Sequence, residues 1–151
     1  MPAPVPTVNS SKDNNEQVTR SSIDTVKGPA DWFTGDVYID AVAGAPAPSR
    51  LNANLVHFMP GARTHWHRHP LSQTLFVTEG VGLCQRRAAR SMSSAPATAF
   101  CSRPTKSTGT ASAPNRLMVH VAINEADAEH AVVHWLTRVT DEDYAVAPAV
   151  S

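Results

Sequence analysis

Short runs of hydrophobic residues separated by turn residues characterise this chain, and no stretch shows the repeat of a long helix. Runs of this kind predict strands, because side chains alternate between the two faces of a strand and turn residues end it. One pair of runs is joined by a turn at Glu79-Gly80, so we expect a hairpin between Thr74–Thr78 and Val81–Arg86. The full set of expected strands is Val37–Asp40, Asn54–Phe58, Thr64–His69, Thr74–Thr78, Val81–Arg86, Leu117–Ile123 and Ala131–Val139.

Many short strands and no long helix predict an all-β fold of the barrel or sandwich type. We expect one domain over residues 23–145, with a short C-terminal tail at 146–151. Residues 1–22 are polar and contain several prolines, which predicts a disordered N-terminal tail. Near the end of the domain, Thr140 precedes three acidic residues, which predicts a helical turn with Thr140 as its N-cap.

The segment 88–112 departs from the pattern of strands. It is rich in Ser, Ala and Thr, it contains no acidic residue, and its only large apolar side chains are Met92 and Phe100. This composition predicts an irregular loop, because the segment offers little apolar surface to bury. A loop of this length is uncommon inside a small domain, which marks the segment as atypical.

The length and net charge of the chain limit the number of domains and the kinds of partner that we expect. The chain has 151 residues, 42% of them hydrophobic, which is enough for one modest core. A net charge of zero with scattered basic residues does not favour nucleic acid or an anionic membrane as a partner, and no apolar run reaches the length of a membrane span. The start of the chain does not resemble a secretory signal, and Cys84 and Cys101 make no disulfide framework, so we expect a cytoplasmic location.

Histidines at alternate positions form the most informative motif. On a strand, His67 and His69 would point to the same side, and Gln73 would return a carboxamide to them after a turn at Pro70. Two neutral imidazoles and an amide oxygen suit a divalent first-row metal. His65 has the same parity and could be a spare ligand, although such a residue more often supports the ligands from the rim.

The spacing of Gly61, His67, His69, Gln73 and Gly80 resembles the first motif of the cupin superfamily, with Gln73 where most cupins carry Glu. Other parts of the chain resemble the bacterial manganese-dependent cupin hydroxynitrile lyases more closely. These parts are Lys27–Gly35, Pro60–Thr64, His67–Thr78 and Val139–Tyr144.

The resemblance implies a single-domain cupin barrel of the double-stranded β-helix or jelly-roll type. It implies a metal held by His67, His69, Gln73 and a fourth histidine from a second motif, with manganese expected and Fe, Zn, Ni or Co as alternatives. It places the catalytic base at His120 and the substrate pocket at Asn54, Val56 and Asn124, the substrate being a small molecule. It also implies a homodimer.

The second motif is missing from this sequence. Counted without gaps, the position of the fourth ligand falls on Thr108. We hypothesise two compensating frameshifts, near Arg87 and near Ser112, because codons for Lys106–Ala111 can spell Glu-His-Trp-His-Gly in a shifted frame. In that frame Ser93–Ala99 can spell Ile-Arg-Pro-Gly-Asp-Gly-Val. Resequencing of the gene tests this hypothesis.

The missing motif predicts a weak or empty metal site and a destabilised barrel, because one ligand of four and two core strands would be lost. The leading function is a metal-dependent enzyme resembling hydroxynitrile lyase, which cleaves a cyanohydrin reversibly to an aldehyde and cyanide, impaired here by the lost ligand. Two alternatives stay open: a cupin oxygenase or isomerase acting on a small organic molecule, and a non-catalytic small-molecule-binding domain.

Overall fold

The computed structural model describes residues 22–87 and 92–145, so the expected tail at 146–151 and all but Ser22 of the expected tail at 1–22 lie outside the described residues. The described residues form thirteen strands and one short helix. The elements are β1 (Thr25–Lys27), β2 (Phe33–Thr34), β3 (Val37–Gly44), β4 (Leu51–Phe58), β5 (Arg63–Thr64), β6 (His67–Arg68), β7 (Gln73–Gly80), β8 (Gly82–Arg86), β9 (Met92–Ser94), β10 (Ala99–Ser102), β11 (Thr108–Ser112), β12 (Met118–Glu125), β13 (His134–Trp135) and α1 (Asp141–Ala145).

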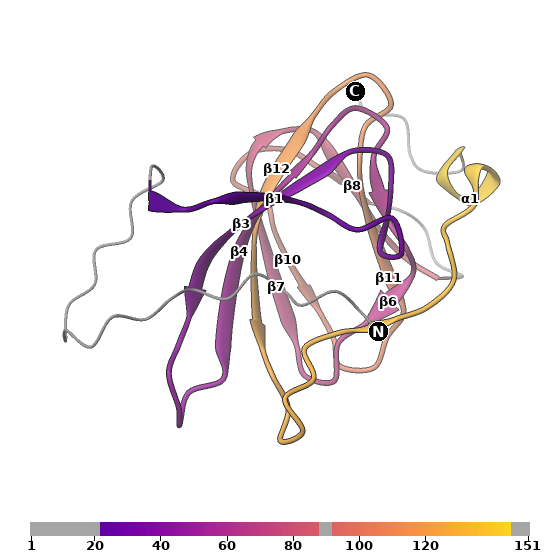
Figure 1. The fold of residues 1–151 in the computed structure, drawn as a ribbon. Helices are drawn as coiled ribbons and strands as arrows, with labels where there is room; N and C mark the ends of the chain where they lie inside the picture. The colour runs from indigo at the N-terminus through magenta and orange to yellow at the C-terminus, as the bar shows by residue number, and fades with distance from the viewer. Residues whose placement is uncertain (1–21, 88–91, 146–151) are drawn as a thin grey trace.

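Two curled antiparallel sheets face each other and form a jelly-roll barrel, which confirms the expected all-β fold. The first sheet has the strand order β1-β3-β4-β12-β7-β10. The second has the order β13-β6-β11-β5-β2, and β8 joins it by pairing with both β11 and β9. In Figure 1, β3, β4, β7 and β10 lie on one side of the barrel, and β6, β8 and β11 lie on the other.

The core follows from the alternation of side chains along the strands. In β7, Gln73, Leu75 and Val77 are buried, while Thr74 and Phe76 are exposed. Residues two apart on a strand lie on one face, so alternate residues of the neighbouring strands also point into the interior. The most deeply buried large side chains are Phe58, Met118, Val37 and Val77.

From residue 92 onward the segment 88–112 forms strands, so the expected irregular loop and the expected loss of core strands are wrong for the described residues. It supplies β9, β10 and β11, and all five residues of β11 are buried. β11 pairs with β8 on one side and with β5 and β6 on the other. Backbone hydrogen bonds hold a strand regardless of side-chain size, and Gly109 leaves room for the Trp66 ring, 3.5 Å from where a Cβ would stand.

The expected hairpin between Thr74–Thr78 and Val81–Arg86 does not form. β7 pairs with β12 and β10 in the first sheet, whereas β8 lies in the second sheet. Gly80 has a φ of 73°, and a Cβ at this position would stand 1.9 Å from the carbonyl oxygen of Leu117. Only glycine fits this close approach, so the chain uses Gly80 to cross between the sheets.

Two other expected strands are interrupted. Thr64–His69 is divided into β5 and β6 by a bend at His65 and Trp66, and only His134–Trp135 of the run Ala131–Val139 is a strand. Both segments lie at one edge of the second sheet, where β13 pairs with β6. The two segments are joined by backbone hydrogen bonds that do not belong to a regular strand pairing. One of them runs from Trp66 N to Thr137 O at 2.9 Å.

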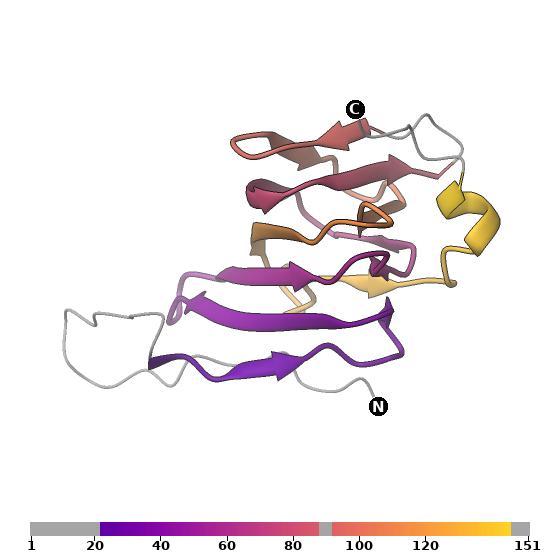
Figure 2. The ribbon, with the colours of Figure 1, turned by 90° about the horizontal axis from the view of Figure 1, so that it is seen from above.

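The helical turn α1 forms as expected, and Thr140 Oγ1 accepts a hydrogen bond from Asp143 N at 3.1 Å. The buried Arg63 docks this turn on the barrel. Its Nε donates to Val139 O at 3.2 Å, its guanidinium pairs with Asp141, and it lies 4.7 Å from the centre of the Tyr144 ring. Figure 2 shows α1 outside the two sheets.

Within the described part of the chain, no helix is both long and apolar enough to cross a membrane.

We expect the amides of β11 to exchange slowly with solvent deuterium. Ser112 N donates to Ala62 O at 3.0 Å and Thr110 N donates to Thr64 Oγ1 at 2.9 Å, and both donors are buried. Exchange therefore requires opening of the second sheet. Hydrogen exchange followed by mass spectrometry or NMR is expected to show rates at least 10³-fold slower than for the exposed turn residue Asn115. Equal rates would mean that the segment is not a strand in solution.

Candidate metal and substrate site

A cavity of about 140 Å³ lies between the two sheets. Both sheets contribute to its wall, and so does the loop between β12 and β13. The side chains that line it include His67, His69, Gln73, His120, Asn52, Asn54, Val56, Phe58, Thr64, Thr110, Ala122, Asn124, Val132, Val133, Trp32, Phe33, Ile39 and Trp135. The cavity thus brings together all three residues expected to bind metal and the expected base.

Backbone carbonyls fix the orientation of both candidate imidazole ligands. His67 Nδ1 is 3.0 Å from His65 O, and His69 Nδ1 is 2.8 Å from Val132 O. Since a carbonyl can only accept, both Nδ1 atoms carry the proton, which leaves the lone pair on Nε2. His69 Nε2 is buried without a hydrogen-bond partner among the described residues. A neutral imidazole held in this way fits the role of a metal ligand.

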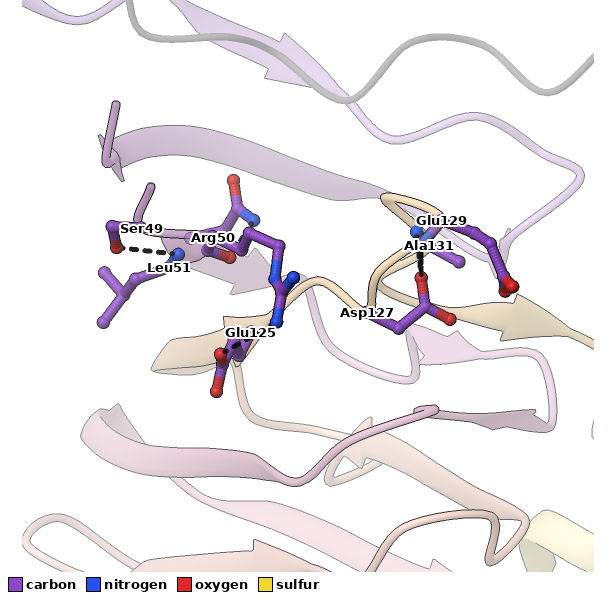
Figure 3. Close-up of polar contacts among 8 residues, drawn as sticks. Ser49, Arg50, Leu51, Glu125, Asp127, Glu129 and Ala131 are labelled. Atoms are coloured by element: carbon purple, nitrogen blue, oxygen red, sulfur yellow. Dashed lines mark hydrogen bonds and ion pairs between the residues drawn. The ribbon is translucent and has the colours of Figure 1, made fainter. Parts of the chain in front are cut away.

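The loop that holds His69 is itself fixed by Asp127. Its carboxylate oxygen Oδ1 accepts hydrogen bonds from Glu129 N at 3.0 Å and from Ala131 N at 2.8 Å (Figure 3). Asp127 N also donates to Ala131 O at 2.9 Å. This closed turn positions Val132 one residue later, and therefore the carbonyl that orients the His69 ring.

Arg50 and Glu125 flank the same end of the barrel. They form an ion pair at 3.8 Å between β12 and the residue preceding β4 (Figure 3). Both side chains are exposed, so the pair adds little stability. The neighbouring backbone bond from Ala126 N to Arg50 O at 2.9 Å closes the end of the sheet more firmly.

Gln73 is buried at the start of β7, and its side chain lies beside His69, where it raises the pKa of that ring. Burial acts more strongly in the opposite direction, so the net pKa of His69 is lowered. No group of three His, Cys, Asp or Glu side chains among the described residues is placed to hold a metal ion. A metal site here would therefore need a ligand other than His, Cys, Asp or Glu. The carboxamide oxygen of Gln73 could be such a ligand.

Thr108 stands directly opposite His67 in the pairing of β11 with β6. Residues directly opposite in an antiparallel pair place their side chains on the same face of the sheet. The Thr108 side chain is therefore on the inner face, 5% exposed. Its hydroxyl is a poor ligand for a divalent metal compared with an imidazole.

His120 lies in β12, where its ring packs 5.3 Å from the ring of Phe58. Burial, together with the nearby His67, lowers the pKa of His120 to about 3. Its Nδ1 is buried and has no hydrogen-bond partner in the described part of the chain. A neutral ring with a free nitrogen in a cavity can accept a proton from a bound molecule.

The expected pocket residues Asn54, Val56 and Asn124 all line the cavity. Asn124 Oδ1 is buried without a partner among the described residues, so it can accept a hydrogen bond from a ligand. His65 is different: it is buried but does not belong to the cavity lining. The bend between β5 and β6 breaks the strand parity that would have aligned it with His67.

Comparisons with known proteins identify the family of this chain. No family model matches the chain. A protein of Granulicella tundricola named (R)-mandelonitrile lyase is 44% identical over 118 residues, which cover 78% of this chain and 89% of that protein. A crystal structure of a cupin-like protein from Thermotoga maritima has a TM-score of 0.75 and 32% identity, over 80% of this chain and 92% of the other. This chain belongs to the cupin superfamily.

A more distant structure shows the same fold. The polyketide cyclase of Streptomyces resistomycificus has a TM-score of 0.67 at 16% identity, and the match covers 86% of this cupin and 90% of the cyclase. Cupins usually bind a metal, and the two oriented imidazoles of this cupin fit such a group.

Aromatic side chains form one wall of the cavity, and they were not predicted from the sequence as part of the site. Trp32 and Trp135 stack with ring centres 5.3 Å apart, and Phe33 meets Trp135 edge-on at 5.7 Å. The Trp135 ring also lies 5.0 Å from the ring of His67. Trp135 comes from β13, which is 68 positions away from His67 in sequence, so local spacing carries no signal for this contact.

Acid is expected to destabilise this cupin through its buried histidines. The ordinary histidine pKa is 6.5, whereas burial lowers the pKa of His67 to about 4 and that of His120 to about 3. Below pH 6.5 the unfolded chain therefore binds protons that the folded chain does not, and stability falls as the pH falls. From pH 6.5 to pH 5 the loss is on the order of 2 kcal/mol per ring.

Urea unfolding at several pH values, in the presence of EDTA, measures this loss. The variant His120→Gln removes one of the two rings, so its stability should depend less steeply on pH between 6.5 and 5. A variant with the same pH dependence as the natural chain would show that the His120 ring is not protected from protonation in the fold.

Proposed function

We propose that this cupin is a metal-dependent lyase that cleaves a cyanohydrin reversibly to an aldehyde and cyanide. The observation that carries the proposal is the pair of imidazoles, His67 and His69, each with Nδ1 tied to a carbonyl. The relative named (R)-mandelonitrile lyase supports this reaction over others known for the fold. His67, His69 and Gln73 would hold the metal, and manganese is the proposed ion.

A bound divalent metal supplies Lewis-acid polarisation of the substrate hydroxyl. The residues of the chain do the rest. His120, neutral at pH 7, takes the hydroxyl proton at a ring nitrogen as the carbonyl forms and cyanide departs with the electron pair of the broken carbon–carbon bond. The ring then gives the proton to cyanide, which regenerates the neutral imidazole.

The cavity wall orients the substrate for this step. Asn54 and Asn124 offer amide groups for hydrogen bonds, and the wall of Trp32, Phe33 and Trp135 offers an apolar surface for an aromatic or aliphatic aldehyde portion. The aromatic side chains also exclude water from the site.

Thr108 favours one alternative function. Without an imidazole at this position the metal would be bound weakly, and the cavity would then serve as a non-catalytic binding site for a small organic molecule. Release of cyanide from mandelonitrile by the manganese-loaded chain distinguishes the lyase from this alternative and from a cupin oxygenase or isomerase.

The variant Thr108→His is expected to bind Mn²⁺ at least 10-fold more tightly than the natural chain. The new imidazole stands opposite His67 on the inner face of the second sheet and would provide a further nitrogen ligand. Competition with a fluorescent chelator measures the affinity. The matched control is Ser107→His, at the residue that precedes β11, which is outside the lining of both cavities. If both variants gain equally, the added histidine is acting away from the site.

The variant His120→Gln is expected to lower kcat for mandelonitrile cleavage by roughly 10²–10⁴-fold, because the proton acceptor is lost. Affinity for Mn²⁺ should stay within about threefold, since His120 is not among the proposed ligands. The background for both measurements is Thr108→His, which loads the metal.

The matched control for this loss is His57→Gln. His57 lies on the same sheet but outside the cavity lining, where it bonds Asp40 at 2.9 Å. Glutamine keeps a donor for Asp40, so kcat should not change. Cleavage by His120→Gln at the rate of the parent chain would remove His120 from the mechanism.

A further inference from the structure

A second cavity, of about 120 Å³, lies next to the metal and substrate cavity. We call it the arginine pocket, and its lining includes Arg86, Arg103, Thr108, Thr110, Cys84 and Cys101. Gln73 and Thr110 line both cavities, so the two are neighbours, and the exposed Arg86, Cys101 and Arg103 lie at the solvent side of the second one. Nothing in the proposed lyase reaction uses this second space.

The arginine pocket carries positive charge that no carboxylate of the described residues balances. Arg86 ends β8 and Arg103 follows β10, so the two guanidinium groups come from different strands. None of the described residues that line the pocket is acidic, and neither arginine makes an ion pair with a described residue. From Val81 to Asn124 the sequence contains no Asp or Glu, and its basic residues are Arg86, Arg87, Arg90, Arg103, Lys106 and Arg116.

The strand register connects this pocket to the candidate ligands. Thr108 is paired with Arg86 on one side and with His67 on the other. Thr108 and His67 are buried on the inner face of the second sheet, and Arg86, at the end of β8, continues this row as an exposed residue. Adjacent strands are about 4.8 Å apart, which places Arg86 about 10 Å from His67 along this row. Small hydroxyl side chains on β11 leave the space between them open.

We propose that the arginine pocket binds the carboxylate of a small organic molecule, whose other end extends past Gln73 into the metal and substrate cavity. The planar guanidinium group matches a carboxylate with paired hydrogen bonds. The hydroxyl groups of Thr108 and Thr110 add neutral donors at the inner end. The volume suits a carboxylate group the size of acetate. Mandelonitrile has no carboxylate, so this inference goes beyond the proposed lyase reaction.

Calorimetric titration of the full metal-free chain with sodium acetate, at constant ionic strength, tests the proposal. Acetate should bind saturably, while acetamide, its neutral counterpart, should not bind. Arg86→Gln and Arg103→Gln should each weaken acetate at least 10-fold. Arg116→Gln, which removes an exposed charge outside the pocket, should leave the affinity unchanged.

Several outcomes would overturn the proposal. They are the absence of saturable acetate binding, equal weakening in all three arginine variants, and binding of inorganic phosphate more tightly than acetate. Urea unfolding of each variant checks that the fold is intact. Because these titrations contain neither metal nor cyanohydrin, their result is independent of whether the lyase activity exists.

Alkylation of Cys101 gives a second measurement on the natural chain. Cys101 is exposed and lines the pocket, so uncharged iodoacetamide should modify it, and saturating acetate should slow the reaction at least fivefold. Acetamide at the same concentration should not slow it. Cys84 is buried, and burial raises its pKa to about 11, so it stays unmodified and does not interfere. An alkylation rate that acetate leaves unchanged would contradict occupancy of the pocket.

Discussion

Backbone pairing of β11 is the constraint on which the rest of this structure depends. The strand bonds β8 on one side and β5 and β6 on the other, so it closes the second sheet with side chains no larger than threonine. Ladder hydrogen bonds require an extended backbone and do not require bulky side chains. The fold therefore persists although the segment lacks the apolar residues that a core strand normally carries, and His67 keeps its place beside it.

The side chains of β11 do not determine how the two candidate imidazole ligands are oriented. His67 and His69 are oriented by carbonyls that do not belong to β11, so a change of side chain on that strand leaves both rings in position. Thr108 offers no nitrogen ligand beside His67, and the small side chains of β11 leave a second cavity that reaches Arg86.

Much of the fold and of the site could be predicted from the sequence, because strands and the histidine motif depend on the spacing of residues close together in the chain. Alternation identified strands such as β4, β7 and β12, and the spacing of His67, His69 and Gln73 identified residues that share a cavity. It failed where tertiary pairing overrides composition, as in β11, and where a glycine moves the chain to the other sheet, as at Gly80. It could not reveal Trp135 or the arginine pocket, since these join distant segments of the chain.

The turn closed by Asp127 affects which tautomer the neutral His69 ring adopts. An imidazole in water exchanges between two neutral tautomers, and the carbonyl of Val132 holds His69 in one of them. Asp127 Oδ1 accepts hydrogen bonds from the amides of Glu129 and Ala131 and so holds the turn that presents this carbonyl. A half-buried carboxylate outside the cavity lining thereby helps to select which nitrogen of a buried ring faces inward. Lengthening the loop by a residue would free the ring to turn its N–H toward the cavity.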